Sequence, residues 1–370
     1  SSAASDVYKR QMPWLGILSL IIAITAIAVR AIGERVLLAT VSVVCVVVQI
    51  GWHWGYIRPQ QTISDAASTA VTQVSSDGLP NTSDRYARIM TFNTKEGHAD
   101  ANRIVEIVKN EHVEVLALQE VSWDLLNRLN SAGIANYLPY SVVAQQTWHD
   151  NGGVNVLYSA APMENAKQNL IPVESSSVSA ATIDFGGSKV RFGSVHPFSP
   201  RPRNQGLWNR SLDSLAQLQH YDNLYVLMGD FNSTWDHASF RYLLGSRFLD
   251  SGQQAGEGLH MTYPAMMPIA EIDHIVHDKG VTVGNLKTAY IPGSDHRALL
   301  ATLEGGSRSR VIGRDSVLPC CHVASVDCAV VALFRCRRSF FAARFMVIAY
   351  VKNGGFVVIF FNFCIKYAIF

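Results

Sequence analysis

Cysteine is missing from most of this sequence. Of the six cysteines in 370 residues, one is Cys45 and the other five begin at Cys320. The long stretch between them can form no disulfide and offers no thiolate ligand, so it is compatible with an oxidising or a reducing compartment. At this length the stretch is still large enough to build a sizeable hydrophobic core.

The same stretch lacks an excess of positive charge. The whole chain carries a net charge of +2, but residues 83–304 hold 17 Lys and Arg against 23 Asp and Glu, a balance of −6. Residues 305–370 hold 9 against 2, a balance of +7. No basic run with interleaved aromatic residues occurs in the acidic part. Because a nuclease must neutralise a phosphate backbone, this distribution disfavours a nucleic-acid substrate without excluding it.

Two long uncharged runs stand near the beginning of the sequence, at residues 13–29 and 36–56. Each approaches the roughly 20 apolar residues that cross a bilayer, and the Trp and Tyr residues at 52–56 are typical of a membrane interface. We therefore expect a hairpin of two transmembrane helices within residues 12–57. The alternative is a signal peptide followed by a buried helix, but no small-residue cleavage site follows the first run.

The charges around these runs give opposing signals about orientation. Arg30 and Arg35 favour a cytoplasmic connection between the helices, whereas Lys9 and Arg10 favour the reverse. We expect the first arrangement, which gives a membrane protein whose residues after Tyr56 lie outside the cytoplasm. Residues 1–11 begin with Ser rather than Met, and we expect that a piece upstream of them is missing.

The two segments that flank the acidic part differ from it in composition. Residues 58–84 are rich in Ser, Thr and Ala without an apolar period, which predicts a flexible linker. Residues 305–370 contain no Glu and no Trp but nine of the sixteen Phe. One interpretation of this tail is a basic appendage associated with a membrane. We favour the other, a shifted reading frame beyond the true end of the protein.

Between these ends, residues 85–304 alternate apolar strands with amphipathic helices. The patterns predict helices at 101–110, 122–130 and about 205–219. They predict strands at ARIMTF, VEVLAL, SVVA, VNVLYS, SAATIDF, KVRFGSV, LYVLM, EIDHIVH and RALLATL. Some strands follow one another closely and others flank a helix, so the expected fold is an α/β sandwich with helices covering the outer faces of packed sheets.

Many of the expected strands carry a polar side chain at or next to one end. These residues are Asn93, Glu120, His196, Asp230, Asn232, Asp273, Asp295 and His296. Taken singly, each has an ordinary explanation as a turn former, a helix cap or a satisfied core histidine. Because strand ends meet at one rim of a sheet, so many in one region are expected to converge there.

The chemistry of these side chains points to metal-assisted hydrolysis. Carboxylate and amide oxygens without cysteine suit a hard ion such as Mg²⁺ or Mn²⁺ rather than zinc. An Asp beside a His can fix the imidazole tautomer and stabilise its charged form. Attack of water on a phosphorus ester needs a metal ion, a group that orients water and donors for the developing charge.

The order of these motifs resembles the endonuclease/exonuclease/phosphatase superfamily, which includes deoxyribonuclease I, apurinic endonucleases, neutral sphingomyelinases and inositol-polyphosphate 5-phosphatases. The matching motifs are Asn93, Gln119-Glu120, His196, Gly229-Asp230-Phe231-Asn232, Asp273 and Ser294-Asp295-His296. The resemblance covers about residues 85–304. It implies a four-layer α/β/β/α sandwich, as in deoxyribonuclease I, and Mg²⁺-dependent hydrolysis of phosphoesters.

The resemblance also implies which residues hold the metal ion. Glu120 would be the principal ligand, and Asn93 and Asp295 would lie close to the ion. All three offer oxygen ligands, as a hard divalent cation requires.

Five further residues receive catalytic roles from the resemblance. Asp230 would orient or deprotonate the attacking water, and Asn232 would hold a phosphoryl oxygen. His296, paired with Asp273, would be the imidazole beside the scissile phosphate, while His196 would donate to the phosphate. Whether Asp230 or His296 accepts the proton is left open by the sequence.

One basic stretch interrupts the acidic domain. It follows His196 and contains Arg201, Arg203 and Arg210. The ordinary interpretation is a solvated loop that leads into a helix. The functional one is a clamp for a second phosphate group, since arginine recognises phosphate through two parallel hydrogen bonds.

The expected membrane hairpin, the TFNTKEG segment and the His-Pro loop together resemble VanJ-like bacterial members of the superfamily, which act on undecaprenyl lipid phosphates. This resemblance implies a membrane-anchored phosphohydrolase for a lipid-linked phosphate or pyrophosphate. A membrane anchor suits such a substrate, because a tethered site gains effective concentration toward a molecule in the same bilayer. The alternatives are a membrane-tethered nuclease or sphingomyelinase-type phosphodiesterase, and a non-catalytic binding module. No protein partner is implied.

Overall fold

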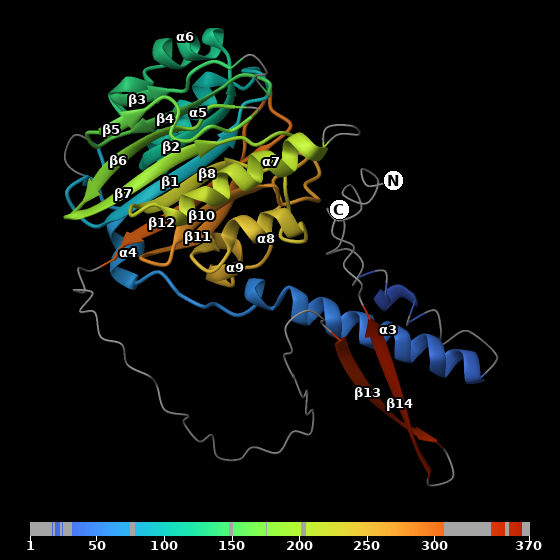
Figure 1. Ribbon diagram of the computed structural model, residues 1–370. Helices are drawn as coiled ribbons and strands as arrows, with labels where there is room; N and C mark the ends of the chain where they lie inside the picture. Colours follow the sequence, from blue (N-terminus) through green and yellow to red (C-terminus); the bar gives the residue numbers. More distant parts are fainter. Residues whose placement is uncertain are drawn as a thin grey trace. The chain divides into compact units, whose positions relative to one another are not determined.

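Figure 1 shows a computed structural model of the chain. It describes residues 32–74, 78–147, 151–174, 176–200 and 205–306, the strands 342–351 and 355–364, and a few residues between 17 and 24. The chain divides into two compact units, residues 1–310 and 311–370.

The first unit is built on two six-stranded sheets. One sheet contains β1 (Tyr86–Asn93), β2 (Val113–Val121), β3 (Tyr140–Val143), β4 (Val154–Ser159), β11 (Val281–Tyr290) and β12 (Arg297–Gly305). The other contains β5 (Glu164–Lys167), β6 (Ser179–Phe185), β7 (Ser188–Val195), β8 (Leu224–Asp230), β9 (Phe248–Asp250) and β10 (Asp273–Asp278). The strand orders are β11-β12-β1-β2-β4-β3 and β5-β6-β7-β8-β10-β9. β1 with β2 and β7 with β8 are parallel pairs in otherwise antiparallel sheets, so both sheets are mixed.

Helices and single turns connect these strands. The helices are α4 (Asp65–Ala70), α5 (Ala101–Asn110), α6 (Trp123–Ser131), α7 (Gln205–Ala216), α8 (Ala238–Leu244) and α9 (Ser251–Ala255). Short 3₁₀ turns are η1 (Trp54–Tyr56), η2 (Ile134–Asn136) and η3 (Gln217–His220). Side-chain caps fix where helices begin: Asp100 accepts from the backbone N–H groups of the first turn of α5, and Ser122 does the same for α6.

Three hydrophobic clusters hold the layers together. Met90 packs with Ile104 of α5, while its neighbour Ile89 faces the other way and packs with Phe192 of the second sheet. Leu212 of α7 belongs to a third cluster on the outer face of that sheet. Each fully buried side chain of this size contributes about 1.5–3 kcal/mol. The order is helices, sheet, sheet, helices (Figure 1), which confirms the expected α/β fold with two packed sheets.

Some elements were not expected from the sequence. In β11 the pairing with β12 shifts between Gly284 and Lys287, and Asn285 has a positive φ of 52°. This bulge breaks the alternation of apolar and polar residues that would have revealed the strand. The short helices α8 and α9 and the strands β5 and β9 have too few residues to show a clear period.

Part of the segment expected to be a flexible linker contacts β12 and α9 within the first unit. Ser64 caps α4, and its backbone N–H donates to Glu304 Oε2 at 3.1 Å. The Gln60 N–H donates to the Gln254 carbonyl at 2.8 Å. These contacts fasten residues 60–70 to β12 and α9.

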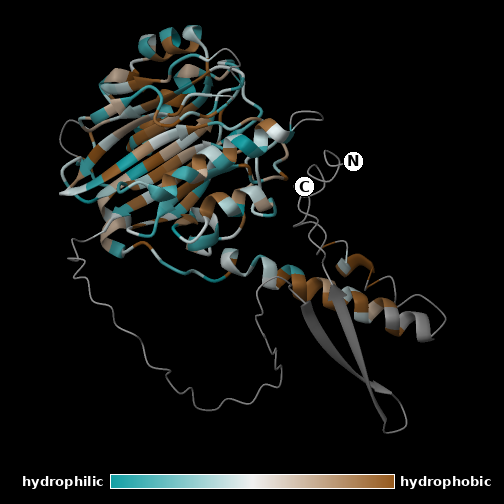
Figure 2. Cartoon of the chain, in the orientation of Figure 1, coloured by the Kyte–Doolittle hydropathy of each residue, from teal (hydrophilic) through white to brown (hydrophobic). Residues whose placement is uncertain are grey.

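The second expected membrane run, residues 36–56, overlaps α3 (Ile32–Trp52) and ends in the turn η1. The described side chains of α3 are largely apolar and exposed, including Val43 and Val47. Much of α3 is accordingly brown in Figure 2. Most of the first run, residues 13–29, lies outside the described residues. Within the part of the chain that the structure describes, no helix is long and apolar enough to cross a membrane, so the expected hairpin is unsupported.

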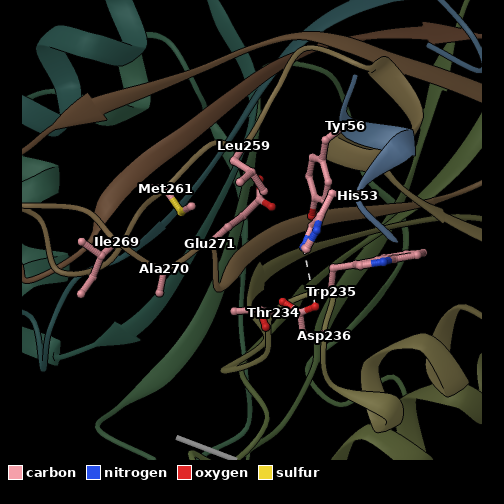
Figure 3. Close-up of a pocket in the computed structure, with 10 residues that line it drawn as sticks. All are labelled: His53, Tyr56, Thr234, Trp235, Asp236, Leu259, Met261, Ile269, Ala270 and Glu271. Carbon is pink, nitrogen blue, oxygen red and sulfur yellow. Dashed lines mark ion pairs between the residues drawn. The ribbon is translucent and has the colours of Figure 1, made fainter. Parts of the chain in front are cut away.

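Polar contacts join the end of α3 to Asp236, which follows β8. Trp52 Nε1 donates to Asp236 Oδ1 at 2.8 Å, and His53 Nε2 lies 3.6 Å from the same oxygen. Figure 3 shows His53 and Tyr56 together with Asp236 and Glu271 around a space of about 10 Å³. This space is no larger than one water molecule needs, so it is a packing gap rather than a ligand site.

The second unit contains one described element, a ribbon of two antiparallel strands. They are β13 (Ala342–Val351) and β14 (Gly355–Cys364). The remaining residues of the tail lie outside the described part of the chain, and the shifted-frame interpretation of 305–370 stays a prediction.

Candidate active site

The strand ends of the first sheet bring four of the expected residues together. Asn93 is paired in register with Gln119, which places Glu120 beside the end of β1. β12 runs antiparallel to β1, so the segment before β12 lies at the same rim. Ser294 Oγ donates to the Asn93 carbonyl at 2.7 Å and thereby fixes the loop that carries Asp295 and His296.

The second sheet contributes the other four by the same geometry. β7 and β8 are parallel, and Val195 pairs with Gly229, so His196 and Asp230 leave the sheet side by side. β10 runs antiparallel to β8, and its first residue, Asp273, pairs with Asp230.

The two rims meet, and hydrogen bonds cross between the sheets. Asn93 Nδ2 donates to Glu120 Oε1 at 3.0 Å and to Asp230 Oδ2 at 3.1 Å, so one amide joins carboxylates from both sheets. His296 Nδ1 lies 2.8 Å from Asp273 Oδ2, which is a second link. The expected convergence of polar strand ends is therefore observed.

A cleft of about 480 Å³ opens at this rim. Among the expected residues, those that line it are Glu120, His196, Asp230, Asn232, Asp295 and His296. Asn93 and Asp273 lie behind them, 1% and 0% exposed. The cleft therefore presents carboxylates, an amide and two imidazoles to a bound molecule.

Hydrogen-bond donors surround the Asp230 carboxylate. The Asn232 N–H donates to Oδ1 at 2.7 Å, and Asn93 donates to Oδ2. The Nε2 atoms of His196 and His296 lie 3.5 and 3.6 Å from Oδ2. This number of donors favours the ionised carboxylate, although Asp230 is only 2% exposed.

The ionisation of the cluster follows from burial and from these neighbours. Burial opposes ionisation of Asp230, but the two imidazoles and the Asn232 N–H together hold its pKa below the usual range. Burial opposes protonation of His296, but Asp273 and Asp230 raise its pKa to about 10. Burial, which outweighs its bond to His296, raises the pKa of Asp273.

His196 lies deeper than expected for a group that touches substrate directly. Its Nε2 atom lies 3.1 Å from Asn151 Nδ2 and 3.3 Å from Asn232 Nδ2. The residue is 2% exposed, and its Nδ1 is a buried atom with no hydrogen-bond partner in the part of the chain that the structure describes. Burial works against its charge, but the Asp230 carboxylate raises its pKa.

Asn151 and the two glycines that follow it are site residues that the sequence analysis missed. A Cβ on Gly152 would lie 2.7 Å from the Glu120 carboxyl, and one on Gly153 would lie 2.7 Å from the Glu120 carbonyl carbon. Glu120 itself has a positive φ of 55°, an uncommon conformation for Glu. The Asn-Gly-Gly sequence before β4 could have indicated a special backbone conformation. The residue that it contacts, Glu120, is far away in the sequence, so the sequence alone did not reveal the contact.

Two groups of residues could bind a metal ion. Asp230, Asp273 and His296 each offer an atom within 4.8 Å of the others. However, His296 Nδ1 is hydrogen-bonded directly to Asp273, which leaves no space for an ion between them. The second group is the one that the resemblance implies.

In that second group, Glu120 and Asp295 both line the cleft, with Asn93 directly behind Glu120. The Glu96 N–H donates to Glu120 Oε2 at 2.9 Å, so the carboxylate is oriented by its surroundings. Oxygen donors of this kind fit a hard divalent cation. The second group is therefore the better fit.

Of the three arginines expected to bind phosphate, Arg210 falls within the described residues. Arg201 and Arg203 lie outside the described residues. Arg210 makes two hydrogen bonds to the Glu174 carboxylate, at 2.5 and 2.9 Å, so its guanidinium is engaged in an exposed ion pair. A role of Arg210 as a phosphate clamp would require this pair to open.

Comparison with solved structures finds a fold similar to that of D. rerio TDP2. A humanized TDP2 of D. rerio with 14 mutations and D. rerio TDP2 complexed with single strand DNA product are each 16% identical, with a TM-score of 0.50. In both cases the match covers 60% of this chain and 100% of the other chain. An endonuclease/exonuclease/phosphatase from Bacteroides vulgatus is 17% identical, with 60% and 99% covered and a TM-score of 0.49.

The curated proteins contain no significant match to the sequence. A sequence model of the endonuclease/exonuclease/phosphatase family, in contrast, matches residues 90–296. That range begins within β1 and ends at His296, so it contains all eight polar residues of the rim. The chain therefore belongs to the endonuclease/exonuclease/phosphatase family.

Proposed function

We propose that this family member is a Mg²⁺-dependent phosphohydrolase that acts in the cleft between its two sheets. The observation that carries the proposal is the contact of Asn93 with both Glu120 and Asp230. This contact places Glu120, a carboxylate suited to binding a metal ion, next to Asp230, a carboxylate suited to orienting the attacking water. The buried His296–Asp273 pair lies beside them.

Glu120, Asn93 and Asp295 would hold the metal ion. When bound, the ion would supply polarisation of the phosphoryl oxygen and stabilisation of the leaving group.

The other residues act on water and on the phosphoryl group. Asp230, held by its hydrogen-bond donors, is placed to orient the attacking water and to take its proton. His296, whose Nδ1 is fixed by Asp273, presents Nε2 to a phosphoryl oxygen or to the leaving group. Asn232 lines the cleft, and its Nδ2, which also donates to the Pro197 carbonyl at 3.2 Å, would donate to a phosphoryl oxygen. A new P–O bond forms to the water oxygen while the P–O bond to the leaving group breaks.

The proposed substrate is a lipid-linked phosphate or pyrophosphate, and the enzyme would be anchored in a membrane with its catalytic domain outside the cytoplasm. Three features support this part. The domain is net acidic, which disfavours a polyanionic substrate. The exposed valines of α3 and the two uncharged runs suit a bilayer. Arg30 and Arg35 favour a cytoplasmic connection between the runs.

A nuclease or a phosphodiesterase for another substrate is the alternative. The observation that favours it is the fold shared with D. rerio TDP2, one structure of which is complexed with single strand DNA product. At 16% identity this likeness concerns the fold. The net negative charge of the domain disfavours this alternative, because a nuclease must neutralise a phosphate backbone.

Two chromogenic esters test the reaction class. The full chain is assayed with p-nitrophenyl phosphate and with bis-p-nitrophenyl phosphate, with Mg²⁺ and after its removal by EDTA. We expect Mg²⁺-dependent hydrolysis of at least one ester and its loss in Asp230→Asn. If the well-folded protein hydrolyses neither ester, the proposed hydrolase activity is contradicted and a non-catalytic binding module becomes the better interpretation.

A further inference from the structure

The loop after β1 turns back through three consecutive residues with positive φ. The values are 50° for Lys95, 51° for Glu96 and 77° for Gly97. A residue with a side chain seldom adopts this conformation, which costs on the order of 1–3 kcal/mol and persists only where the surrounding structure fixes it.

Hydrogen bonds on both sides fix this loop. The Lys95 N–H donates to Asn93 Oδ1 at 2.9 Å, and the Glu96 N–H donates to Glu120 Oε2 at 2.9 Å. The Arg128 guanidinium donates to the Gly97 carbonyl and, at 2.8 Å, to the Ala99 carbonyl. The backbone that carries Lys95 is therefore tied to two residues of the metal-binding group.

Lys95 is also set apart by its charge. Among the described residues that line the cleft, four are acidic, and Lys95 is the only Lys or Arg. Its ammonium group has no ion-pair partner among the residues that the structure describes, although the cleft is rich in carboxylates. A cation on a fixed backbone at the edge of an acidic cleft is suited to an anion that enters from outside.

We propose that Lys95 binds the phosphoryl oxygens of the substrate, and that the substrate presents a compact terminal group, a phosphate monoester or pyrophosphate. This inference rests on the proposed function, because it assumes that a phosphoryl group enters the cleft. An ammonium group with three donors can contact a terminal phosphate from several directions. A polynucleotide backbone would need several cations along its path.

The test uses the full chain, with inorganic phosphate as the probe. Lys95→Met keeps an unbranched side chain, shorter by one atom, and a similar φ cost but removes the charge. Lys95→Arg keeps the charge. Lys109→Met, on the exposed end of α5, is the matched control. Phosphate binding is measured by calorimetry in the presence of Mg²⁺, and KM and kcat are measured with the better of the two chromogenic esters.

We expect Lys95→Met to weaken phosphate binding about tenfold, the effect of losing one hydrogen bond to a charged group. KM should rise by a similar factor with a smaller change in kcat. Lys95→Arg should recover most of the binding, and Lys109→Met should bind as the unaltered chain does. If Lys95→Met binds phosphate unchanged, or if only Arg201→Met and Arg203→Met weaken binding, the proposal is wrong.

The same measurements separate this inference from the proposed function. A chain that binds phosphate through Lys95 but hydrolyses no ester would support the binding site and contradict the hydrolase. A chain that hydrolyses esters with a KM unaffected by Lys95→Met would support the hydrolase and contradict this inference. Binding of duplex DNA tighter than that of phosphate, with no dependence on Lys95, would overturn the proposed substrate class.

Discussion

His296 and Asp273 form a buried pair that links the two sheets at the cleft. His296 Nδ1 lies 2.8 Å from Asp273 Oδ2, and the opposite ring nitrogen lies 3.6 Å from Asp230 Oδ2. Because Asp273 occupies one nitrogen, the ring is held in a single orientation with Nε2 directed to the cleft side. The pair thus combines a fixed geometry with a charge that Asp273 and Asp230 stabilise.

Asp273→Asn should lower kcat by about 10²-fold or more, since an amide cannot stabilise the charged imidazole and favours another tautomer. KM should change little, because Asp273 lies behind the cleft wall. Steady-state kinetics with a chromogenic ester measure both constants. Asp213→Asn, an exposed change on α7, is the control. An unchanged kcat in a folded Asp273→Asn protein would remove the pair from the mechanism.

Glu120→Gln should weaken binding of a divalent ion by at least about 10–100-fold, the range known for groups that merely support a metal ligand. Binding of Mn²⁺, followed by electron paramagnetic resonance, gives this result without any turnover. Glu106→Gln, in an exposed pair with Arg103, is the control. If Glu120→Gln binds Mn²⁺ normally and Asp273→Asn does not, the ion belongs to the Asp230, Asp273 and His296 group.

Gly229→Ala should damage the site through the backbone. A Cβ at this position would lie 1.9 Å from the Val195 carbonyl oxygen, so β7 and β8 would have to separate next to His196 and Asp230. We expect a loss of about 1–3 kcal/mol of stability and a larger loss of activity.

Gly206→Ala is the matched control for that change. Its Cβ would meet only the flexible end of Arg210, at 3.3 Å, within α7. Because Ala favours a helix over Gly, this substitution should be neutral or stabilise by up to about 1 kcal/mol. Urea unfolding and ester hydrolysis are measured for both variants. Equal behaviour of the two would show that the close approach of the strands does not matter.

Stability should fall as the pH rises, because of a buried cluster outside the cleft. His274 Nδ1 lies 2.9 Å from Asp250 Oδ1, and its Nε2 lies 2.8 Å from the Ser233 carbonyl oxygen. Burial opposes its charge, but Asp250 raises the pKa of His274 to about 9. Burial and the nearby Asp250 raise the pKa of Glu271 to about 7.

The sign is the same for both groups, since each has a folded pKa above its unfolded value. Their stabilising contribution is complete below the unfolded pKa and is lost as the pH rises through the folded one. The contribution of Glu271 to the free energy of unfolding is lost between about pH 4.5 and 7, and that of His274 between about pH 6.5 and 9. The loss from His274 is on the order of 3 kcal/mol. Urea unfolding at a series of pH values measures this. His274→Gln should reduce the fall in stability above pH 6.5 without abolishing it, because His296, with a pKa of about 10, loses stability over the same range. A stability that rises from pH 7 to 9 in the unaltered chain would contradict the assignment.

Much of the rim could be predicted from the sequence because strand direction and residue order determine it. Strand pairing places Asn93 beside Gln119-Glu120 in one sheet, and it places Asp230 beside His196 and Asp273 in the other. The family and the class of enzyme, a metal-dependent hydrolase of phosphoester bonds, are confirmed by the family match. The roles of the individual residues stay predictions.

Other features depend on contacts between distant segments, which a sequence pattern does not reveal. Gly152 and Gly153 matter because they touch Glu120 of another strand, and only the folded chain shows this. Trp52 was assigned to a membrane interface, whereas its indole N–H donates to Asp236. The ion pair of Arg210 with Glu174 likewise joins residues that are far apart in the sequence.

The substrate panel tests the central claim most directly. Product release by the full chain is measured with undecaprenyl pyrophosphate, sphingomyelin and duplex DNA, with and without Mg²⁺, and with Asp230→Asn as the inactive reference. We predict Mg²⁺-dependent release of phosphate from the lipid pyrophosphate in preference to the other two substrates, and none from Asp230→Asn. Rapid hydrolysis of DNA with no action on the lipid pyrophosphate would contradict the proposed function.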